Sequence, residues 1–272
     1  MNSPKTILIT GASTGIGKET AILFAKKGWN VVATMRTPEK GNDLLVYPTI
    51  KIVRLDVMDE ESIEQAIKVA FETFQSIDVL YNNAGYALVG TFEAMTPEQI
   101  KKQFDTNVFG VMNVTRALLP YFRTHKKGTI ITTTSIGGLL TFPLFSVYHG
   151  TKWALEGFLE SLQYELRPFN IRVKNIEPGP IRTEFENAIE FVSTKEYDTY
   201  SQKANLNMLS FYTNAPTADV VAKKVWKAAN SSSFRLRYAV GFSGNLFLVI
   251  RKLLPFSWFR FLVRSQVEKG IK

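Results

Sequence analysis

The chain reads Lys5-Thr6-Ile7-Leu8-Ile9-Thr10-Gly11-Ala12-Ser13-Thr14-Gly15-Ile16-Gly17 near its N-terminus, and this stretch decides the fold. Its first half is a short apolar, β-branched run that predicts a buried strand, and a helical pattern follows over residues 18–27. Glycines between them allow a tight turn in which the backbone can approach a ligand closely. Because the N-terminus of the following helix attracts anions, the segment predicts a phosphate-binding turn. Taken alone, a glycine pattern of this kind is a weak signal, and an ordinary strand-to-helix turn is the alternative.

Further apolar runs of strand length alternate with helical patterns along the rest of the chain. We predict strands at residues 6–10, 30–35, 50–55, 77–81, 129–134, 171–176 and, more weakly, 236–240. We predict helices at residues 15–27, 60–74, 97–123, 147–167 and 217–229. Such alternation indicates parallel βαβ units, and the commonest open sheet of this type is doubly wound. The predicted fold class is therefore α/β, with a doubly wound parallel β-sheet in a single domain spanning residues 1–272.

Composition excludes several classes of site. The sequence has no cysteine, which excludes disulfides and thiolate chemistry, and with two histidines a histidine-rich metal centre is not expected. The net charge of +9 comes from lysines scattered among glutamates, so we interpret most of it as solvated surface that helps to attract an anionic ligand. Without an arginine-rich tract we expect no nucleic-acid partner. No signal peptide is recognisable, and we expect a cytoplasmic protein.

A second segment supplies reactive side chains. Ser135 precedes Tyr148 by thirteen residues, and Lys152 follows Tyr148 by four, so a helix would put the phenol and the ammonium on one face. To exchange protons at neutral pH, the pKa of the phenol must fall by about three units, or about 4 kcal/mol. One charge at about 4 Å supplies roughly that amount at an effective dielectric of about 20. Because desolvation opposes phenolate formation, a second positive charge such as an oxidised nicotinamide is also needed, which points to a redox cofactor.

Five segments that carry polar residues or glycines follow predicted strands closely. They are residues 11–17, Asp56-Val57, Asn82-Asn83-Ala84-Gly85, Ser135 and Pro178-Gly179. Since ligands bind beyond the carboxyl ends of the strands in such sheets, we expect these segments to converge on one site.

With Asn107, these motifs resemble those of the short-chain dehydrogenase/reductase family, over roughly residues 6–183. The glycine turn, the Asn-Asn-Ala-Gly segment and the Asn107, Ser135, Tyr148 and Lys152 set occur in the order of the family, and Pro178-Gly179 is followed by Thr183. The resemblance implies a Rossmann fold that binds a nicotinamide dinucleotide. The pattern looks most like the hydroxysteroid and retinol dehydrogenase branch, an analogy that fixes no substrate.

The resemblance also implies roles for single residues. Tyr148 would be the acid/base, Ser135 would orient and polarise the carbonyl, Lys152 would lower the tyrosine pKa and hold the nicotinamide ribose, and Asn107 would support a water in a proton relay. Asp56 would hydrogen-bond the adenine amino group, with an N-cap of the following helix as the alternative. The expected cofactor-binding residues are Gly11, Ser13, Thr14, Gly15, Ile16, Gly17, Arg36, Asp56, Val57, Asn83, Ala84, Gly85, Tyr148, Lys152, Pro178, Gly179, Ile181 and Thr183.

The end of the second predicted strand indicates which dinucleotide is used. The position where NAD-preferring members of the family carry Asp is Met35, and Arg36 follows it. A guanidinium can fork onto a 2′-phosphate, and such a bond contributes about 1.5–3 kcal/mol. We therefore predict NADP(H), with an unremarkable surface arginine as the alternative.

Residues 183–216 have no clear strand or helix period and form a long, aromatic connection. It contains Phe185, Phe191, Tyr197, Tyr200, Leu206, Met208, Leu209, Phe211 and Tyr212. Long loops of this type are often lids, so we expect an aromatic substrate lid and a bulky apolar substrate.

Residues 245–268 form an apolar, aromatic C-terminal helical extension that Pro255 divides into two helices. Three interpretations remain open: a core or subunit-contact helix, which we favour, a wall of the substrate pocket, and a helix lying in a membrane interface. We expect a soluble homo-oligomer, a dimer or tetramer that associates through the helices at 97–123 and 147–167.

The predicted function is an NADP(H)-dependent oxidoreductase that interconverts a secondary alcohol and a carbonyl on a hydrophobic substrate. A dinucleotide-binding sensor or scaffold without chemistry is the alternative, although a binding role needs no tuned phenol. An epimerase or dehydratase of nucleotide sugars also uses Tyr and Lys but usually has a longer chain with a separate substrate domain.

Overall fold

The structure, a computed structural model, describes residues 3–184 and 189–270. Its main feature is a parallel sheet of seven strands in the order β3-β2-β1-β4-β6-β7-β9. The strands are β1 (Thr6–Thr10), β2 (Asn30–Met35), β3 (Ile50–Arg54), β4 (Val79–Asn82), β6 (Gly128–Thr133), β7 (Ile171–Pro178) and β9 (Arg237–Val240). The strand order reverses between β1 and β4, so the predicted doubly wound α/β fold is confirmed.

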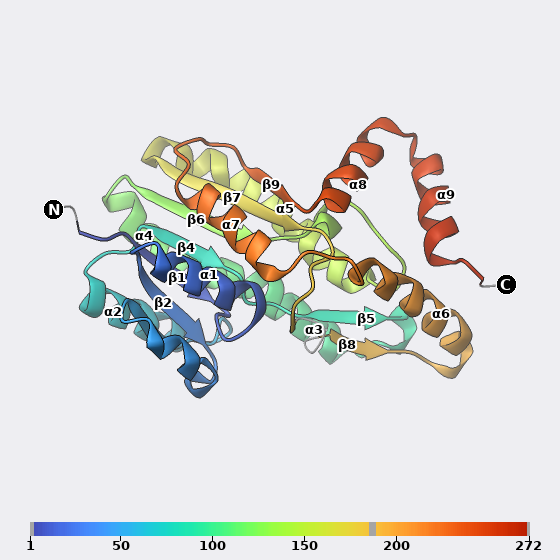
Figure 1. The fold of residues 1–272 in the computed structure, drawn as a ribbon, viewed down its shortest axis with the longest axis horizontal. Coiled ribbons are helices and arrows are strands. Elements are labelled where there is room, and N and C mark those ends of the chain that lie inside the picture. Colours follow the sequence, from blue (N-terminus) through green and yellow to red (C-terminus); the bar gives the residue numbers. More distant parts are fainter. Residues whose placement is uncertain (1–2, 185–188, 271–272) are drawn as a thin grey trace.

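Helices cover both faces of the sheet (Figure 1). Helices α1 (Gly15–Lys26) and α7 (Ala218–Ala229) pack on one face, against alternate strand residues such as Ile7 and Ile9. Helices α2 (Glu60–Phe74), α4 (Gly110–Thr124) and α5 (Ser146–Leu166) cover the other face, where Leu8 points. Because both faces are buried, the central strands β1 and β2 carry continuous apolar runs, Ile7-Leu8-Ile9 and Val31-Val32-Ala33, as expected in a parallel sheet. Apart from one interrupted helix, the predicted bounds of these elements differ from the observed ones by at most two residues.

The helix predicted at residues 97–123 is interrupted. Helix α3 (Pro97–Phe104) begins with the capping box of Thr96 and Gln99, and a π-helical turn (η3, Asp105–Phe109) separates it from α4. The turn contains Asn107, which is buried. Insertions of this kind occur often at functional sites because they redirect one side chain without breaking the helix.

Asp56 does not cap the helix that follows β3, so that alternative is wrong. The side chain of Asp59 accepts a hydrogen bond from the backbone N–H of Ser62 at 3.1 Å and is the N-cap of α2. The carboxylate of Asp56 instead accepts from the N–H of Met58 at 3.0 Å, within the turn that leads to the helix.

The expectation that residues 183–216 lack regular structure is also wrong. Strand β8 (Ile189–Val192) pairs in parallel with β5 (Ala87–Gly90), and helix α6 (Asp198–Leu209) follows. The pairing is tight at Gly90, where a Cβ would lie 1.8 Å from the carbonyl oxygen of Val192. Pairing between segments so distant in sequence leaves no periodic signal in either one. Phe185, named among the lid aromatics, lies outside the described residues.

Two helices follow β9 and extend from one end of the molecule (Figure 1). They are α8 (Phe242–Leu253) and α9 (Phe256–Val267), and Pro255 separates them as predicted. Within residues 3–184 and 189–270, no helix has both the length and the apolar character needed to cross a bilayer.

Candidate active site

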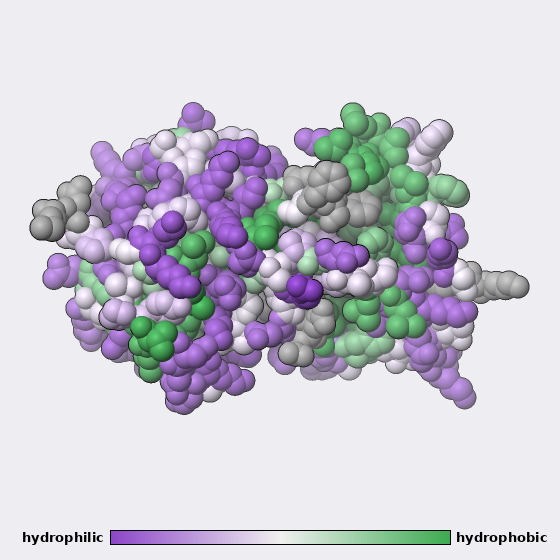
Figure 2. Space-filling view, in the orientation of Figure 1, coloured by the Kyte–Doolittle hydropathy of each residue, from purple (hydrophilic) through white to green (hydrophobic). Residues whose placement is uncertain are grey.

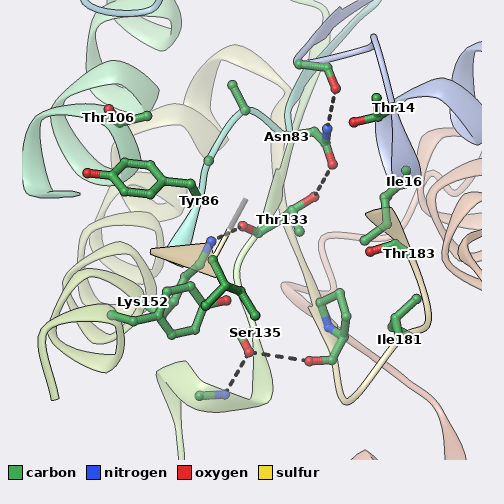
Figure 3. A pocket seen from close by; sticks show the side chains of 18 of the residues that line it. Thr14, Ile16, Asn83, Tyr86, Thr106, Thr133, Ser135, Lys152, Ile181 and Thr183 are labelled. Carbon is green, nitrogen blue, oxygen red and sulfur yellow. Dashed lines mark hydrogen bonds between the residues drawn. The ribbon is translucent and has the colours of Figure 1, made fainter. Parts of the chain in front are cut away.

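The main cavity, of about 1000 Å³, opens at the carboxyl ends of the parallel strands. Predicted site residues that line it are Gly11, Ser13, Thr14, Gly15, Ile16, Arg36, Asp56, Val57, Asn83, Ala84, Gly85, Ser135, Tyr148, Lys152, Pro178, Gly179, Ile181 and Thr183. Figure 3 shows how several of them face the same space from different elements. Two predicted residues, Gly17 and Asn107, do not line the cavity.

The turn after β1 requires glycine for two reasons. Gly11 has a left-handed φ of 67°, and a Cβ there would lie 2.8 Å from the Cα of Ala84. Gly17 lies one turn into α1, where a Cβ would come within 2.2 Å of the carbonyl oxygen of Gly11. Gly17 therefore lets the helix pack on the turn, and the remaining glycines leave the backbone accessible from the cavity.

Asn83 fixes the position of this turn from the end of β4. Its amide nitrogen donates to the carbonyl oxygens of Thr10 at 3.2 Å and Gly11 at 3.0 Å. Its amide oxygen accepts from the hydroxyl of Thr133 on β6 at 3.3 Å. The dashed lines in Figure 3 follow this chain of bonds, which connects three neighbouring strands at the edge of the cavity.

Ser135 follows β6 and points into the cavity (Figure 3). Its hydroxyl oxygen accepts from the backbone N–H of Gly137 at 3.0 Å and donates to the carbonyl of Pro178 at 3.4 Å. These two bonds tie the hydroxyl to the ends of β6 and β7, so its position is set by the backbone around it.

Tyr148 and Lys152 are one turn apart on α5, as their spacing predicts. The Nζ of Lys152 lies 5.6 Å from the centroid of the Tyr148 ring and donates to the carbonyl of Thr133 at 2.9 Å. Lys152 is only 7% exposed. The geometry brings the ammonium beside the phenol and anchors it to β6 at the same time.

The electrostatics of the pair differ from the simple expectation. Burial raises the pKa of Tyr148, the nearby Tyr212 raises it further, and hydrogen bonding to Ser135 opposes both. Burial also lowers the pKa of Lys152 to about 8, against the attraction of Glu156. Desolvation is the largest influence on the pKa of the phenol, so a further positive charge is needed to lower that pKa.

Asn107 lies behind the cavity wall. Its amide nitrogen donates to the carbonyl of Tyr86 at 2.9 Å and to the hydroxyl of Thr151 at 3.3 Å, and its oxygen accepts from the N–H of Tyr86 at 3.2 Å. Since Thr151 precedes Lys152 on α5, the π-helical turn connects the wall near Tyr86 to the reactive helix.

Sequence reasoning missed several residues that line the cavity. Lys40, in the 3₁₀ segment that follows β2 (Pro38–Val46), lines the same cavity as Arg36, and a cation at that place could have been noticed. Phe142 and Phe145 form part of the wall beside α5, together with Met208, Phe211 and Tyr212 of the predicted lid. In the sequence, the segment before α5 resembles an ordinary turn. No local pattern indicates that the rings of Phe142 and Phe145 point into the cavity.

His149 also borders the cavity, but its contacts are those of a packed residue. It is 5% exposed, its ring stacks on Phe145 at 5.6 Å, and its Nδ1 accepts from the N–H of Phe142 at 3.4 Å. Burial lowers the pKa of the imidazole to about 4. These contacts therefore favour a packing role for His149 over a catalytic one.

Curated relatives resemble this chain over nearly its whole length. An uncharacterised oxidoreductase of Bacillus subtilis, YusZ, is 37% identical over 277 aligned residues, which cover 97% of this chain and 98% of the relative. Retinol dehydrogenase 8 of Bos taurus is 34% identical over 293 aligned residues, covering 96% and 93% respectively.

Solved structures show the same fold. A short-chain dehydrogenase from Streptomyces avermitilis superposes with a TM-score of 0.85 and 32% identity, covering 99% of this chain and all of that one. The structure of ElxO with NADP bound has a TM-score of 0.75 and 29% identity, over 87% and 97% of the two chains. The family model for short chain dehydrogenases matches residues 5–191, which contain the glycine turn, Ser135, Tyr148 and Lys152. The chain therefore belongs to the short-chain dehydrogenase/reductase family of oxidoreductases.

Proposed function

We propose that this protein is an NADP(H)-dependent oxidoreductase that interconverts a secondary alcohol and a carbonyl on a hydrophobic substrate. The observation that carries the proposal is the presence of Ser135, Tyr148 and Lys152 in the cavity that the glycine turn also borders. A hydroxyl, a phenol and an ammonium from β6 and α5 face the same space as a turn built for a phosphate.

The residues fit a nicotinamide dinucleotide. The side chain of Thr14, the N-cap of α1, makes no capping hydrogen bond, and the N–H of Gly15 donates to the carboxylate of Glu184 at 3.3 Å, so an anionic group already lies at this helix N-terminus. The N–H groups and the dipole of the helix therefore favour a pyrophosphate there. Asp56 borders the cavity beyond β3, where its carboxylate could accept a hydrogen bond from an adenine amino group.

A preference for NADP(H) is supported by two cations at the end of β2. Arg36 and Lys40 both line the cavity. At the position where a carboxylate would repel the 2′-phosphate, this chain has Met35 instead.

Replacing Arg36 tests this preference. Arg36→Ala should weaken NADPH binding by about 1.5–3 kcal/mol and leave NADH binding nearly unchanged, as measured by fluorescence titration. Arg54→Ala, at the end of the adjacent β3, is the matched control. Equal losses for both dinucleotides would refute the assignment of Arg36.

The dinucleotide, when bound, supplies or accepts the hydride at the carbonyl carbon. The protein supplies the proton: Tyr148 donates it to the carbonyl oxygen in reduction and takes it back in oxidation. Ser135, held by Gly137 and Pro178, would donate a hydrogen bond to the same oxygen and orient it. Lys152 stabilises the phenolate that remains after proton donation, because its ammonium lies beside the ring.

Asn107 would support the proton path from behind the cavity. Its bonds to Tyr86 and Thr151 hold the wall next to Lys152, and they leave the π-helical turn as a fixed platform for an ordered water. Asn107 would therefore act as a positioning residue for the catalytic groups.

The cavity walls support a bulky apolar substrate. Around Tyr148 the cavity is lined by the apolar or aromatic side chains of Phe142, Phe145, Ile189, Met208, Phe211 and Tyr212. Such a lining excludes water and binds apolar groups without requiring a charged substrate. Secondary alcohols and ketones of steroid or retinoid size are the first substrates to test.

The decisive test is Tyr148→Phe. This change removes the proton donor and keeps the ring, so turnover should be lost while NADPH still binds, as followed by absorbance and by fluorescence. Tyr164→Phe, a change at an exposed tyrosine on the same helix, is the control and should behave like the wild type. Wild-type turnover by Tyr148→Phe would refute the mechanism. NADPH binding without oxidation on any of a panel of ketones and aldehydes would favour a non-catalytic sensor.

We further propose a cytoplasmic homo-oligomer that associates through the segments at residues 97–123 and 147–167, which contain α3, the π-helical turn, α4 and α5. Exposed aromatic side chains on this side of the molecule, Phe109, Trp153 and Tyr164, support a contact there. Light scattering tests this proposal, and a monomer at micromolar concentration would refute it.

A further inference from the structure

Helices α8 and α9, here called the C-terminal hairpin, are only half buried. Phe259 is 3% exposed and packs with Ile136 and Leu140, and Val267 is buried against α6. Ile250 and Val263 pack partly against the same clusters. This inner face attaches the hairpin to the domain. The burial expected from the sequence is therefore found on this face of the segment.

The outer face of the hairpin is apolar and exposed. Its large hydrophobic side chains, between 42% and 76% exposed, are Leu246, Val249, Leu253, Phe256, Trp258, Phe261 and Leu262. On α8, Leu246, Val249 and Leu253 are spaced by three and four residues and lie on one side, and on α9 Trp258 shares a side with Phe261 and Leu262. Figure 2 shows apolar residues gathered near the connection between α8 and α9, with hydrophilic residues among them along α9. A cluster of large exposed apolar side chains of this kind marks an interaction surface rather than ordinary solvent exposure.

Basic residues surround this face. From Phe242 to the C-terminus the sequence carries six Lys or Arg residues and one Glu, so this short segment supplies more than half of the net charge of +9. Lys252 and Arg260 are exposed, and the guanidinium of Arg251 lies 5.1 Å from the Phe256 ring. Arg264 pairs with Glu268 at 2.9 Å, which neutralises only one of these cations.

The charge selects among possible occupants. A second copy placed on this face would bring two sets of like charges together, which disfavours association. An anionic lipid surface matches both features, because aromatic and aliphatic side chains enter the acyl boundary while Lys and Arg remain at the headgroups. Each helix has 12 residues and is about 18 Å long, too short for a hydrocarbon core of about 30 Å, so the hairpin would lie flat.

We propose that the outer face of the C-terminal hairpin docks on anionic phospholipid membranes. The hairpin also backs the wall of the cavity: Phe259, Ile250 and Val263 pack with Ile136 and Phe142, and these last two line the cavity. This inference rests on the function proposed above. Because the hairpin lies against the cavity wall, the substrate belongs to the class of apolar alcohols and ketones dissolved in a membrane. Docking would then place the cavity close to the bilayer from which such a substrate comes.

The test is flotation of the purified full chain with two kinds of vesicle, phosphatidylcholine alone and an equal mixture with phosphatidylglycerol. The wild type should float with the mixed vesicles and at least about fivefold less with phosphatidylcholine alone, since each cation near an anionic surface contributes about that factor. Trp258→Ser/Phe261→Ser should lower the partition coefficient at least about tenfold. Lys252→Glu/Arg260→Glu should remove the preference for the anionic vesicles.

A matched control changes two equally exposed apolar residues at the far edge of the sheet and beyond β5, Leu45→Ser/Phe92→Ser, and should float like the wild type. Circular dichroism confirms that each variant is folded. Failure of the wild type to float, or equal losses for control and hairpin variants, would overturn the proposal. So would a dimer that Trp258→Ser/Phe261→Ser converts to monomers without any flotation, since a second copy would then be the occupant.

An activity measurement separates docking from chemistry. Trp258→Ser/Phe261→Ser should turn over a small water-soluble ketone like the wild type and lose at least about tenfold on an apolar ketone carried in mixed vesicles. Equal rates on the vesicle substrate would overturn the assignment of the substrate class. If no ketone is reduced by any form, the proposed function fails, and flotation still decides whether the hairpin docks.

Discussion

Replacing Lys152 by methionine should stabilise the free protein while abolishing its activity. Burial lowers the pKa of Lys152 from its ordinary value of 10.5 to about 8. At about 1.4 kcal/mol for each pH unit, the buried charge costs the folded state about 3 kcal/mol near pH 7. Methionine keeps the packing of the stem and loses the bond to the Thr133 carbonyl, which contributes about 1 kcal/mol. The net gain in the free energy of unfolding is about 2 kcal/mol.

The gain should depend on pH in a defined direction. Below pH 8 both the folded and the unfolded wild type bind the lysine proton, and the cost of burial is fully present. Between pH 8 and 10.5 only the unfolded state still binds it, so the wild-type stability rises with pH and the advantage of the variant disappears. Urea denaturation followed by circular dichroism at several pH values measures this difference directly.

Lys68→Met provides the control, because Lys68 is exposed on α2 and its replacement should produce no such pH dependence. A Lys152→Met protein that is less stable than the wild type at pH 7 would refute the reasoning. A stability difference that stays constant from pH 7 to 10.5 would also refute it, since the difference would then not come from the lysine proton.

Two further changes test the packing around the cavity. The buried imidazole of His149 has a pKa lowered to about 4, so wild-type stability should fall as the pH drops from about 6.5 to 4, by at most about 3 kcal/mol, and His149→Asn should remove most of that fall in acid denaturation. Gly17→Ala should cost about 1–3 kcal/mol and weaken NADPH binding, because its Cβ would collide with the Gly11 carbonyl. Gly157→Ala, at an open position in α5, should instead stabilise by up to about 1 kcal/mol. Thermal melts compare the two glycine variants, and equal effects would contradict the argument from close packing.

The sequence alone determined the features that depend on local pattern. Apolar runs of strand length identified the strands of the main sheet, and they are continuous in the central strands β1 and β2, which are buried on both faces. The order of strands and helices then allowed few topologies. The reactive residues could be recognised in the sequence because Tyr148 and Lys152 belong to one helix. The glycine turn could be recognised because its residues are contiguous.

Tertiary structure alone decided the features made by contacts between distant segments. The pairing of β5 with β8 and the rings of Phe142 and Phe145 in the cavity wall depend on how separate segments meet. The π-helical turn is set by the bonds of Asn107 to Tyr86 and Thr151, two segments outside its own helix.

Burial made the largest difference between expectation and structure. Spacing predicted an ammonium beside the phenol, with desolvation opposing its effect, and in the folded protein desolvation is the largest influence: burial raises the pKa of Tyr148 and lowers the pKa of Lys152. The C-terminal segment shows the converse, because its composition suggested a buried helix and the fold covers only one of its faces. The sequence specifies which ionisable and apolar groups are present and in what local order. Which of them lose contact with water is a property of the packed chain, and this loss determines the pKa values of the ionisable groups.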